Sequence, residues 1–187
     1  MSDTSLPRPV PSDARRVATT ALLAALLSAS ALLSIPTQPV PVTLQVLVVV
    51  LIALLVPPRW AAFSVATYLV LGSAGLPVFA GFRGGLAVLL GPTGGFLSGF
   101  LVGAVAGAWT REMLERTVTS QVVADAAAAL VVIVVVYGFG WQQLAVVTGM
   151  GSVPALLAGV VPFVLPDAVK AAVAVALAAG VRRAARI

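Results

Sequence analysis

Cysteine and histidine are both absent from this sequence of 187 residues. Without cysteine, the chain can form neither disulfides nor thiolate metal sites. Without histidine, it lacks the commonest metal ligand, general base and proton relay. Charged residues are scarce as well, at 9% of the chain, against about one quarter in ordinary soluble domains. These absences argue against a metal centre, against acid–base catalysis and against a soluble fold.

Apolar residues are abundant instead, at 60% of the chain, and the mean hydropathy is +1.12. Apolar runs approaching the length that crosses about 30 Å of hydrocarbon recur along the chain. We therefore predict an all-α integral membrane protein with six transmembrane helices, forming a single domain over residues 15–187. The predicted helices cover residues 17–35, 43–57, 61–75, 94–110, 118–138 and 166–181.

The segment before the first apolar run, residues 1–14, is polar and rich in proline, and we predict a disordered tail. A cleaved signal peptide is an alternative interpretation of this tail and the first apolar run. The apolar core is too long for such a peptide, and further spans follow directly. The sequence therefore favours a retained helix.

Basic residues indicate the topology. Six crossings place both termini on one side, together with nine of the eleven basic residues: Arg8, Arg15, Arg16, Arg59, Arg111, Arg116, Arg182, Arg183 and Arg186. By the positive-inside rule this side is the cytoplasm, which leaves only Arg83 and Lys170 on or near the outer side. The basic residues stand at the ends of apolar runs and form no patch with aromatic residues. They therefore predict a lipid bilayer as a partner, and not nucleic acid.

One stretch, LPVFAGFRGGLAVLLGPTGGF over residues 76–96, cannot form an ordinary helix because glycine and proline interrupt it throughout. Arg83 lies in its middle. Irregular backbone at a membrane is tolerated where it is buried in protein or lines a cavity. We predict a Gly/Pro-rich outer loop between the third and fourth spans that acts as a lid or pocket wall. A solvated outer loop is the alternative.

Asp167 and Lys170 stand three residues apart at the start of the last span, so their side chains share one helix face. Charges within a span are costly, and they usually face a cavity or each other. A purely structural ion pair is one interpretation. With Arg83, however, the pair suits a small amphipathic solute that carries a carboxylate and N–H donors. Phe79, Phe82, Tyr68 or Trp141 could then cover the apolar body of the solute.

Small residues form two helical stripes. Ala21, Ala25 and Ala29 recur every four residues in the first span, and glycine does so at 95, 99, 103 and 107 in the fourth. Such stripes allow close helix packing, and for the alanines both an internal neighbour and a partner protein remain open. Asp125, two turns into the fifth span, is expected to be solvated near a helix end, with a functional carboxylate as the alternative.

A resemblance to a known family rests on several motifs. VPVTLQ at 40–45, the run YLVLGSAGLPVFAGFRGGLAVLLGPTGG at 68–95 and LPDAVK at 165–170 together resemble the BioY family. Members are biotin-binding membrane subunits, or S components, of energy-coupling-factor (ECF) transporters. The resemblance implies six transmembrane helices with an outward-side pocket in a bacterial or archaeal cell membrane. It also implies partners: a transmembrane coupling subunit and ABC-type ATPase subunits.

The same resemblance implies roles for single residues. Asp167 and Lys170 would contact biotin, and Arg83 would help line the pocket. The residues in other matching motifs are Gln45, Gly91 and Thr93, and those on the surface that would dock on the coupling subunit are Ala21 and Ala25. The chain departs from the family in having Phe96 where a tyrosine is frequent, which would alter one polar contact in the pocket.

Other functions find less support in the residues. The stretch GPTGG at 91–95 lacks the lysine of a nucleotide-binding loop, so the chain would depend on partner subunits for energy. We predict no enzymatic activity and no cofactor, with biotin as a substrate. A stand-alone carrier for biotin or another small vitamin is the first alternative, and it would support uptake without coupling subunits. A purely structural membrane protein is the second.

Overall fold

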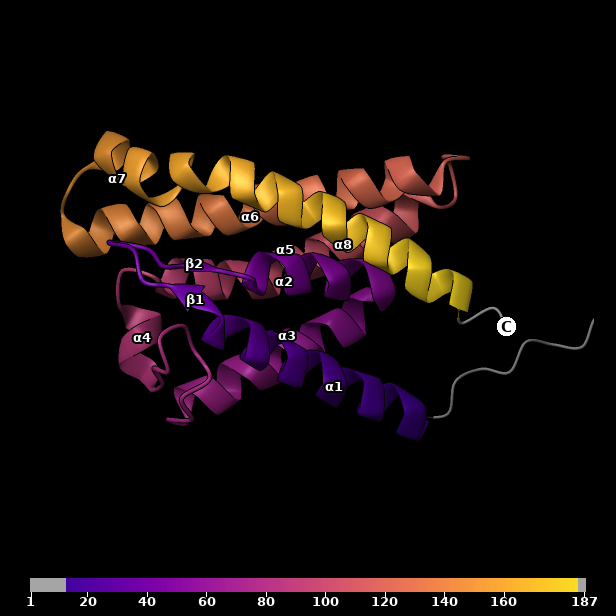
Figure 1. Cartoon of the computed structure of the whole chain (residues 1–187), viewed down its shortest axis with the longest axis horizontal. Coiled ribbons are helices and arrows are strands. Elements are labelled where there is room, and N and C mark those ends of the chain that lie inside the picture. The colour runs from indigo at the N-terminus through magenta and orange to yellow at the C-terminus, as the bar shows by residue number, and fades with distance from the viewer. Residues whose placement is uncertain (1–12, 185–187) are drawn as a thin grey trace, which may run out of the picture.

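The computed structural model describes residues 13–184, with side chains from residue 14 onward, as a bundle of roughly antiparallel helices (Figure 1). The long helices are α1 (Asp13–Leu32), α2 (Gln45–Leu55), α3 (Pro58–Ser73), α5 (Gly94–Leu114), α6 (Gln121–Thr148) and α8 (Val164–Ala184). The short ones are α4 (Leu86–Leu90), α7 (Ser152–Gly159) and the 3-10 helix η1 (Val161–Phe163). The predicted tail over 1–14 lies outside the described residues, except that residues 13 and 14 already belong to α1.

The described residues are mostly helical, as predicted, but the first connection contains a small β-ribbon. Strands β1 (Ser34–Ile35) and β2 (Val42–Thr43) pair antiparallel, with Ser34 opposite Thr43. The prolines between them lack an N–H and cannot continue a helix, whereas β-branched Ile35, Val42 and Thr43 favour extended backbone. The all-α prediction holds for the long elements, and the ribbon is a local addition that the sequence did not predict.

Helix α2 forms the centre of the bundle. It packs against α1, α3, α5, α6 and α8, and nearly every residue from Gln45 to Leu54 is buried. A helix that is apolar on all sides, as VLVVVLIALL is, is typical of one buried in protein or in a membrane, and here neighbouring helices surround it. At 11 residues it is about 16 Å long, shorter than the predicted span over 43–57.

Helices α5 and α6 lie in close contact along the glycine stripe of α5. A Cβ placed on Gly99 would come within 3.0 Å of the Val136 Cα, and one on Gly103 within 3.1 Å of the Val132 carbonyl oxygen. Real Cβ atoms rarely make such short contacts. The two helices can therefore approach this closely only because these positions are glycine. The interpretation of this stripe as a packing face is confirmed.

Helix α6 is longer than the predicted fifth span, which ended at residue 138. It continues through Gly138 and Gly140 to Thr148, and it ends where Gly149 adopts a left-handed φ of 66°. The fifth span predicted over 118–138 therefore ends ten residues too early. A glycine costs a helix about 1 kcal/mol, but here Gly140 makes room for the ring of Phe96, and burial of that ring offsets the cost.

The Gly/Pro-rich segment after α3 is largely irregular, as predicted. An isolated bridge joins Phe79 to Arg83, and the turn between them needs positive φ at Gly81 and Phe82. The five-residue helix α4 then interrupts the segment, and α5 begins at Gly94. This segment, the β-ribbon and α7 all lie at the end of the bundle opposite the start of α1 and the end of α8 (Figure 1).

Three segments of the described chain are long and apolar enough to cross a membrane: Ala14–Leu32, Gln121–Thr148 and Ser152–Ala184. Helix α2 is apolar but shorter. An integral membrane protein is thus supported by length and composition, whereas crossing by all six long helices stays a prediction.

Candidate functional site

A cavity lies at the end of the bundle that carries the β-ribbon and α4. It contains about 600 Å³ of empty space, a figure that includes space open to solvent. Its walls come from the β-ribbon, the segment after α3, and helices α2, α5, α6 and α8. The lining residues used below are Gln45, Phe79, Arg83, Thr93, Phe96, Phe100, Tyr137, Phe163, Asp167 and Lys170.

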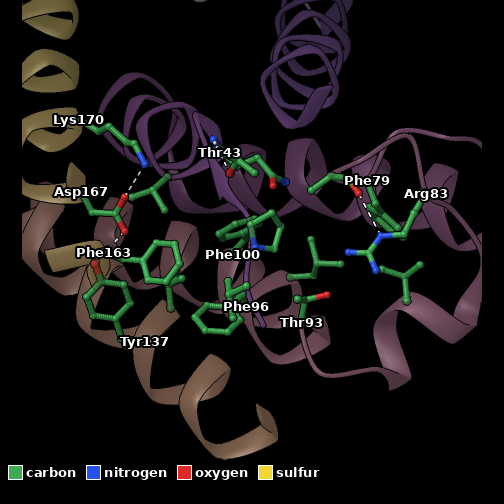
Figure 2. Close-up of a pocket in the computed structure, with 18 residues that line it drawn as sticks. Thr43, Phe79, Arg83, Thr93, Phe96, Phe100, Tyr137, Phe163, Asp167 and Lys170 are labelled. Atoms are coloured by element: carbon green, nitrogen blue, oxygen red, sulfur yellow. Dashed lines mark hydrogen bonds and ion pairs between the residues drawn. The ribbon is translucent and has the colours of Figure 1, made fainter. Parts of the chain in front are cut away.

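Asp167 and Lys170 meet at one side of this cavity (Figure 2). The Lys170 Nζ donates to Asp167 Oδ1 at 2.8 Å, so the shared helix face predicted for the pair is confirmed. Tyr137 on α6 donates its hydroxyl to Asp167 Oδ2, also at 2.8 Å. The side chain of Asp167 is only 3% exposed, so a donor on each oxygen compensates its removal from water.

Arg83 lies at the opposite side of the cavity from Asp167 and Lys170 (Figure 2). Its Nε donates to the Ala80 carbonyl oxygen at 3.1 Å, which anchors the guanidinium to its own turn. Within residues 14–184, no ion pair joins it to a carboxylate. The cavity therefore has a charge-compensated polar side, formed by the Asp167–Lys170 pair, and a cationic side.

Phe79 connects the segment after α3 to the core. Its ring is 1% exposed and meets the ring of Tyr68 edge-on, with centroids 5.4 Å apart. Gln45 lines the cavity and donates its Nε2 to the Tyr68 hydroxyl at 2.8 Å. This contact leaves the Gln45 carbonyl oxygen as an acceptor that a ligand could use. Tyr68 itself lies behind Phe79 and supports the wall without lining it.

Gly91 and Thr93 follow α4, and the structure separates their roles. Thr93 lines the cavity, whereas Gly91 is absent from the lining. The Gly91 carbonyl oxygen instead accepts from Gln143 Nε2 at 2.8 Å, and the Leu89 carbonyl oxygen accepts from the same nitrogen at 2.7 Å. Gln143 on α6 thus fixes the end of α4 through the backbone of Leu89 and Gly91.

The aromatic part of the site differs from the prediction. Phe79 lines the cavity, but Phe82 is 68% exposed, and Trp141 donates to the Ser152 carbonyl oxygen outside it. Phe96, Phe100 and Phe163 line it instead, and Figure 2 shows Phe96 and Phe100 between the two charged sides. Aromatic residues in apolar helices are ordinary, so only the GPTGGF motif, which ends in Phe96, could have pointed to one of them.

Asp125 belongs to a separate charged cluster near the other end of the bundle. It is 1% exposed, its Oδ1 accepts from Arg111 Nε at 2.9 Å, and its Oδ2 is paired with Arg182. Arg182 also donates to the Leu54 carbonyl oxygen at 3.3 Å. The expected solvated position near a helix end is wrong, because two arginines from α5 and α8 cover this carboxylate.

Helix α1 turns its alanine stripe away from the bundle. Ala21, Ala25 and Ala29 are exposed, together with Leu22 and Leu26, whereas Ala24 and Leu27 are buried. Packing inside the protein therefore uses a neighbouring face, and the predicted docking residues remain available to another molecule.

The described residues contain no group of three or more acidic, cysteine or histidine side chains that could hold a metal ion. What this cavity offers is recognition: an ion pair with a tyrosine at one side, a cation at the other, and aromatic rings between them. Such a set can orient a small polar-ended molecule.

Known proteins resemble this chain over nearly its whole length. The sequence model of the BioY family matches residues 3–187. A probable biotin transporter BioY of Pyrococcus horikoshii is 41% identical over 165 residues, covering 88% of this chain and 94% of the relative. The biotin transporter BioY of Thermotoga maritima is 37% identical, covering 84% and 80%.

A solved structure has the same fold. The crystal structure of the S component for biotin from an ECF-type ABC transporter superimposes with a TM-score of 0.86. The alignment covers 94% of this chain and 95% of the other, at 24% sequence identity.

Proposed function

Because this chain belongs to the BioY family, we propose that it is the biotin-binding S component of an ECF-type uptake transporter. It captures biotin at the outer end of the bundle and releases it to the cytoplasm. It is a transport protein and not an enzyme, since its relatives are named biotin transporters. The observation that carries the proposal is the cavity that joins Asp167 and Lys170 to Arg83.

The charges of the cavity favour one orientation of biotin. Its ureido ring is neutral and has both N–H donors and a carbonyl acceptor, which suits the compensated side. Asp167 accepts from the ureido N–H groups, while Lys170 has two further protons to donate. The carboxylate of the valerate tail then lies at Arg83, the cation that no carboxylate of residues 14–184 neutralises.

The middle of the cavity accommodates the apolar part of the ligand. Phe96, Phe100 and Phe163 line it, and such rings remove the thioether ring and methylene chain of biotin from water. Each buried methylene contributes about 0.8 kcal/mol. Polar ends would therefore set specificity, while the aromatic middle supplies much of the affinity.

We place the protein in the cell membrane of a bacterium or archaeon, with six crossings and both termini in the cytoplasm. The start of α1 and the end of α8 lie at the same end of the bundle (Figure 1). Arg59, Arg111 and Arg182 stand at the corresponding ends of α3, α5 and α8, in agreement with the positive-inside rule. The cavity is then on the outer side.

Residues 15–187 form one substrate-binding domain in this proposal, and energy comes from partner subunits. The exposed face of α1 at Ala21 and Ala25 supports docking on the transmembrane coupling subunit, because small residues permit close helix contact. Binding alone does not produce uptake. The empty and loaded states must differ in affinity for biotin or for the partner.

Equilibrium binding of biotin to the purified protein in detergent tests the assignment. We expect wild type to bind biotin, and Lys170→Ala to weaken binding more than about tenfold, or roughly 1.4 kcal/mol. Removal of Lys170 leaves the buried Asp167 carboxylate without its counter-charge. Arg116→Ala removes one positive charge from a side chain that is 75% exposed, and it should bind like wild type.

Absence of biotin binding by folded wild type would refute the substrate. Unchanged binding by folded Lys170→Ala would refute the site. Uptake by cells that lack all coupling and ATPase subunits would instead favour the stand-alone carrier.

A further inference from the structure

A second cavity adjoins the first one. It is an open cavity between the β-ribbon connection and the turn after Phe79, with about 540 Å³ of empty space that includes open solvent. Its lining residues are Ser34, Pro36, Thr37, Gln38, Pro39, Pro41, Ala80, Gly81 and Arg83. Three of them, Pro41, Ala80 and Arg83, also line the first cavity. The two cavities therefore meet at the arginine.

The chemistry of the second cavity differs from that of the first. Its lining contains no aromatic residue and no carboxylate, and the polar side chains of Ser34, Thr37 and Gln38 replace the phenylalanines. Arg83 is the only charged residue of this lining. The prolines and Ala80 supply apolar surface, while Arg83 and the three polar side chains suit a polar or anionic end.

We propose that the second cavity binds the group attached to the carboxyl carbon of a biotin amide, so that the protein also takes carboxyl-linked conjugates such as Nε-biotinyl-lysine. This inference rests on the proposed function and its orientation of biotin. With the ureido ring at Asp167 and the carboxyl group at Arg83, a substituent on that group points toward the cavity junction. It would extend past Pro41, Ala80 and Arg83, which line both cavities, into the second cavity.

Arg83 keeps a partner in this complex. An amide carbonyl oxygen still accepts from the guanidinium, and the α-carboxylate of the lysine restores the negative charge lost on amide formation. The lining of the second cavity has no carboxylate to repel that group. A substituent with a polar, anionic end therefore fits better than an aliphatic amide of similar length.

Competition binding to the full-length purified protein tests the inference. We expect Nε-biotinyl-lysine to displace labelled biotin from wild type with an affinity within about tenfold of that of biotin. The N-hexyl amide of biotin, which has the length but not the polar end, should bind at least about tenfold more weakly than the lysine conjugate.

Thr37→Trp places a large side chain in the second cavity, outside the lining of the first. It should weaken Nε-biotinyl-lysine by at least about tenfold and change the affinity for biotin less than about threefold. Thr37→Val is the matched control, because both variants lose the hydrogen bond from Thr37 Oγ1 to the Val40 carbonyl oxygen at 2.6 Å. If Thr37→Trp does not fold, Gln38→Trp with Gln38→Ala as its control tests the same cavity.

The outcomes separate the inference from the proposed function. Wild type that binds biotin but not the lysine conjugate overturns the inference alone. If the tryptophan variants weaken binding of the conjugate no more than they weaken binding of biotin, the second cavity is not the site of the conjugate. Wild type that binds neither ligand removes the proposed function together with the inference.

Discussion

Asp167 shows how one buried carboxylate can have a donor on each oxygen and still accept from a ligand. Lys170 donates to Oδ1 and Tyr137 to Oδ2, and each carboxylate oxygen has a second acceptor site. The two donors come from α8 and α6, so the carboxylate is held from two directions. We infer that Tyr137 is a positioning residue, which acts on biotin through Asp167.

Tyr137→Phe removes the hydroxyl and keeps the ring. We expect biotin affinity to fall about tenfold, or roughly 1.4 kcal/mol, because the carboxylate loses the donor that fixes Oδ2. Isothermal titration calorimetry measures the change, and thermal unfolding in the same detergent checks that the variant is folded.

A double-mutant cycle with Asp167→Asn separates positioning from general loosening of the cavity. If Tyr137 acts through the carboxylate, Tyr137→Phe should have less than about a third of its single-mutant effect on binding free energy in the Asp167→Asn background. Fully additive effects would contradict a role through Asp167.

At the scale of helices, the contact between α5 and α6 depends on the lack of a side chain at single glycines. A Cβ on Gly95 would lie 2.7 Å from the Gln143 Cβ and 2.9 Å from the Phe139 carbonyl carbon. Gln143 in turn holds the end of α4. The first turn of α5 thus positions both the helix pair and the wall of the cavity.

Gly95→Ala should lower the free energy of unfolding by about 1–3 kcal/mol, because backbone and not a flexible side chain stands in the way of the new methyl group. Gly138→Ala on α6 is the matched control: a Cβ there meets nothing within 4 Å. Helix propensity should then make it neutral or stabilising by up to about 1 kcal/mol. Thermal unfolding in detergent compares the two, and equal melting temperatures would contradict the packing argument.

The lengths of the apolar runs and the glycine spacing were sufficient to predict the long helices and the face of α5 that packs on α6. They did not predict where α6 ends, because the helix continues past Gly140, where the ring of Phe96 from α5 packs against it. Nor did they predict the β-ribbon, in which two-residue strands pair across a proline-rich turn. Contacts between distant segments decide both features, and local patterns do not report such contacts.

For the molecule as a whole, the cavity-lining residues that could be predicted were the rare charges. Asp167, Lys170 and Arg83 stand out in a chain with so few ionisable groups, and the structure brings them to one cavity. Tyr137 could not be predicted, since a tyrosine in an apolar helix has no distinguishing pattern. The burial of Asp125 was not predicted for a related reason: its partner Arg182 is 57 residues away in sequence.

The bundle thus has a charged group near each end, one facing a cavity and one enclosed by protein. At one end, Asp167 and Lys170 face a cavity, whereas at the other, Asp125 is enclosed by Arg111 and Arg182. Asp125 and Tyr137 are 12 residues apart on α6, or about 18 Å. We infer that the Asp125 cluster ties α5, α6 and α8 together and takes no direct part in binding.

Asp125→Asn tests this division. The change removes the carboxylate that Arg111 and Arg182 share, although Arg111 keeps its pair with Glu115. The side chain of Arg182 is only 19% exposed, and breaking a buried pair costs about 3–5 kcal/mol. We expect a clearly lower melting temperature in detergent. The dissociation constant for biotin, measured on the folded fraction, should stay within about twofold, because sites this far apart act independently.

Glu112→Gln is the control for charge itself. It removes one carboxylate near the same end of the bundle, from an ion pair with Arg116 whose side chains are 75% and 50% exposed. Solvated pairs of this kind contribute less than about 1 kcal/mol, so its melting temperature should match wild type. If both variants melted like wild type, the buried cluster would not hold the helices together. If folded Asp125→Asn lost biotin binding, the two ends of the molecule would be coupled, and the cluster would belong to the transport cycle.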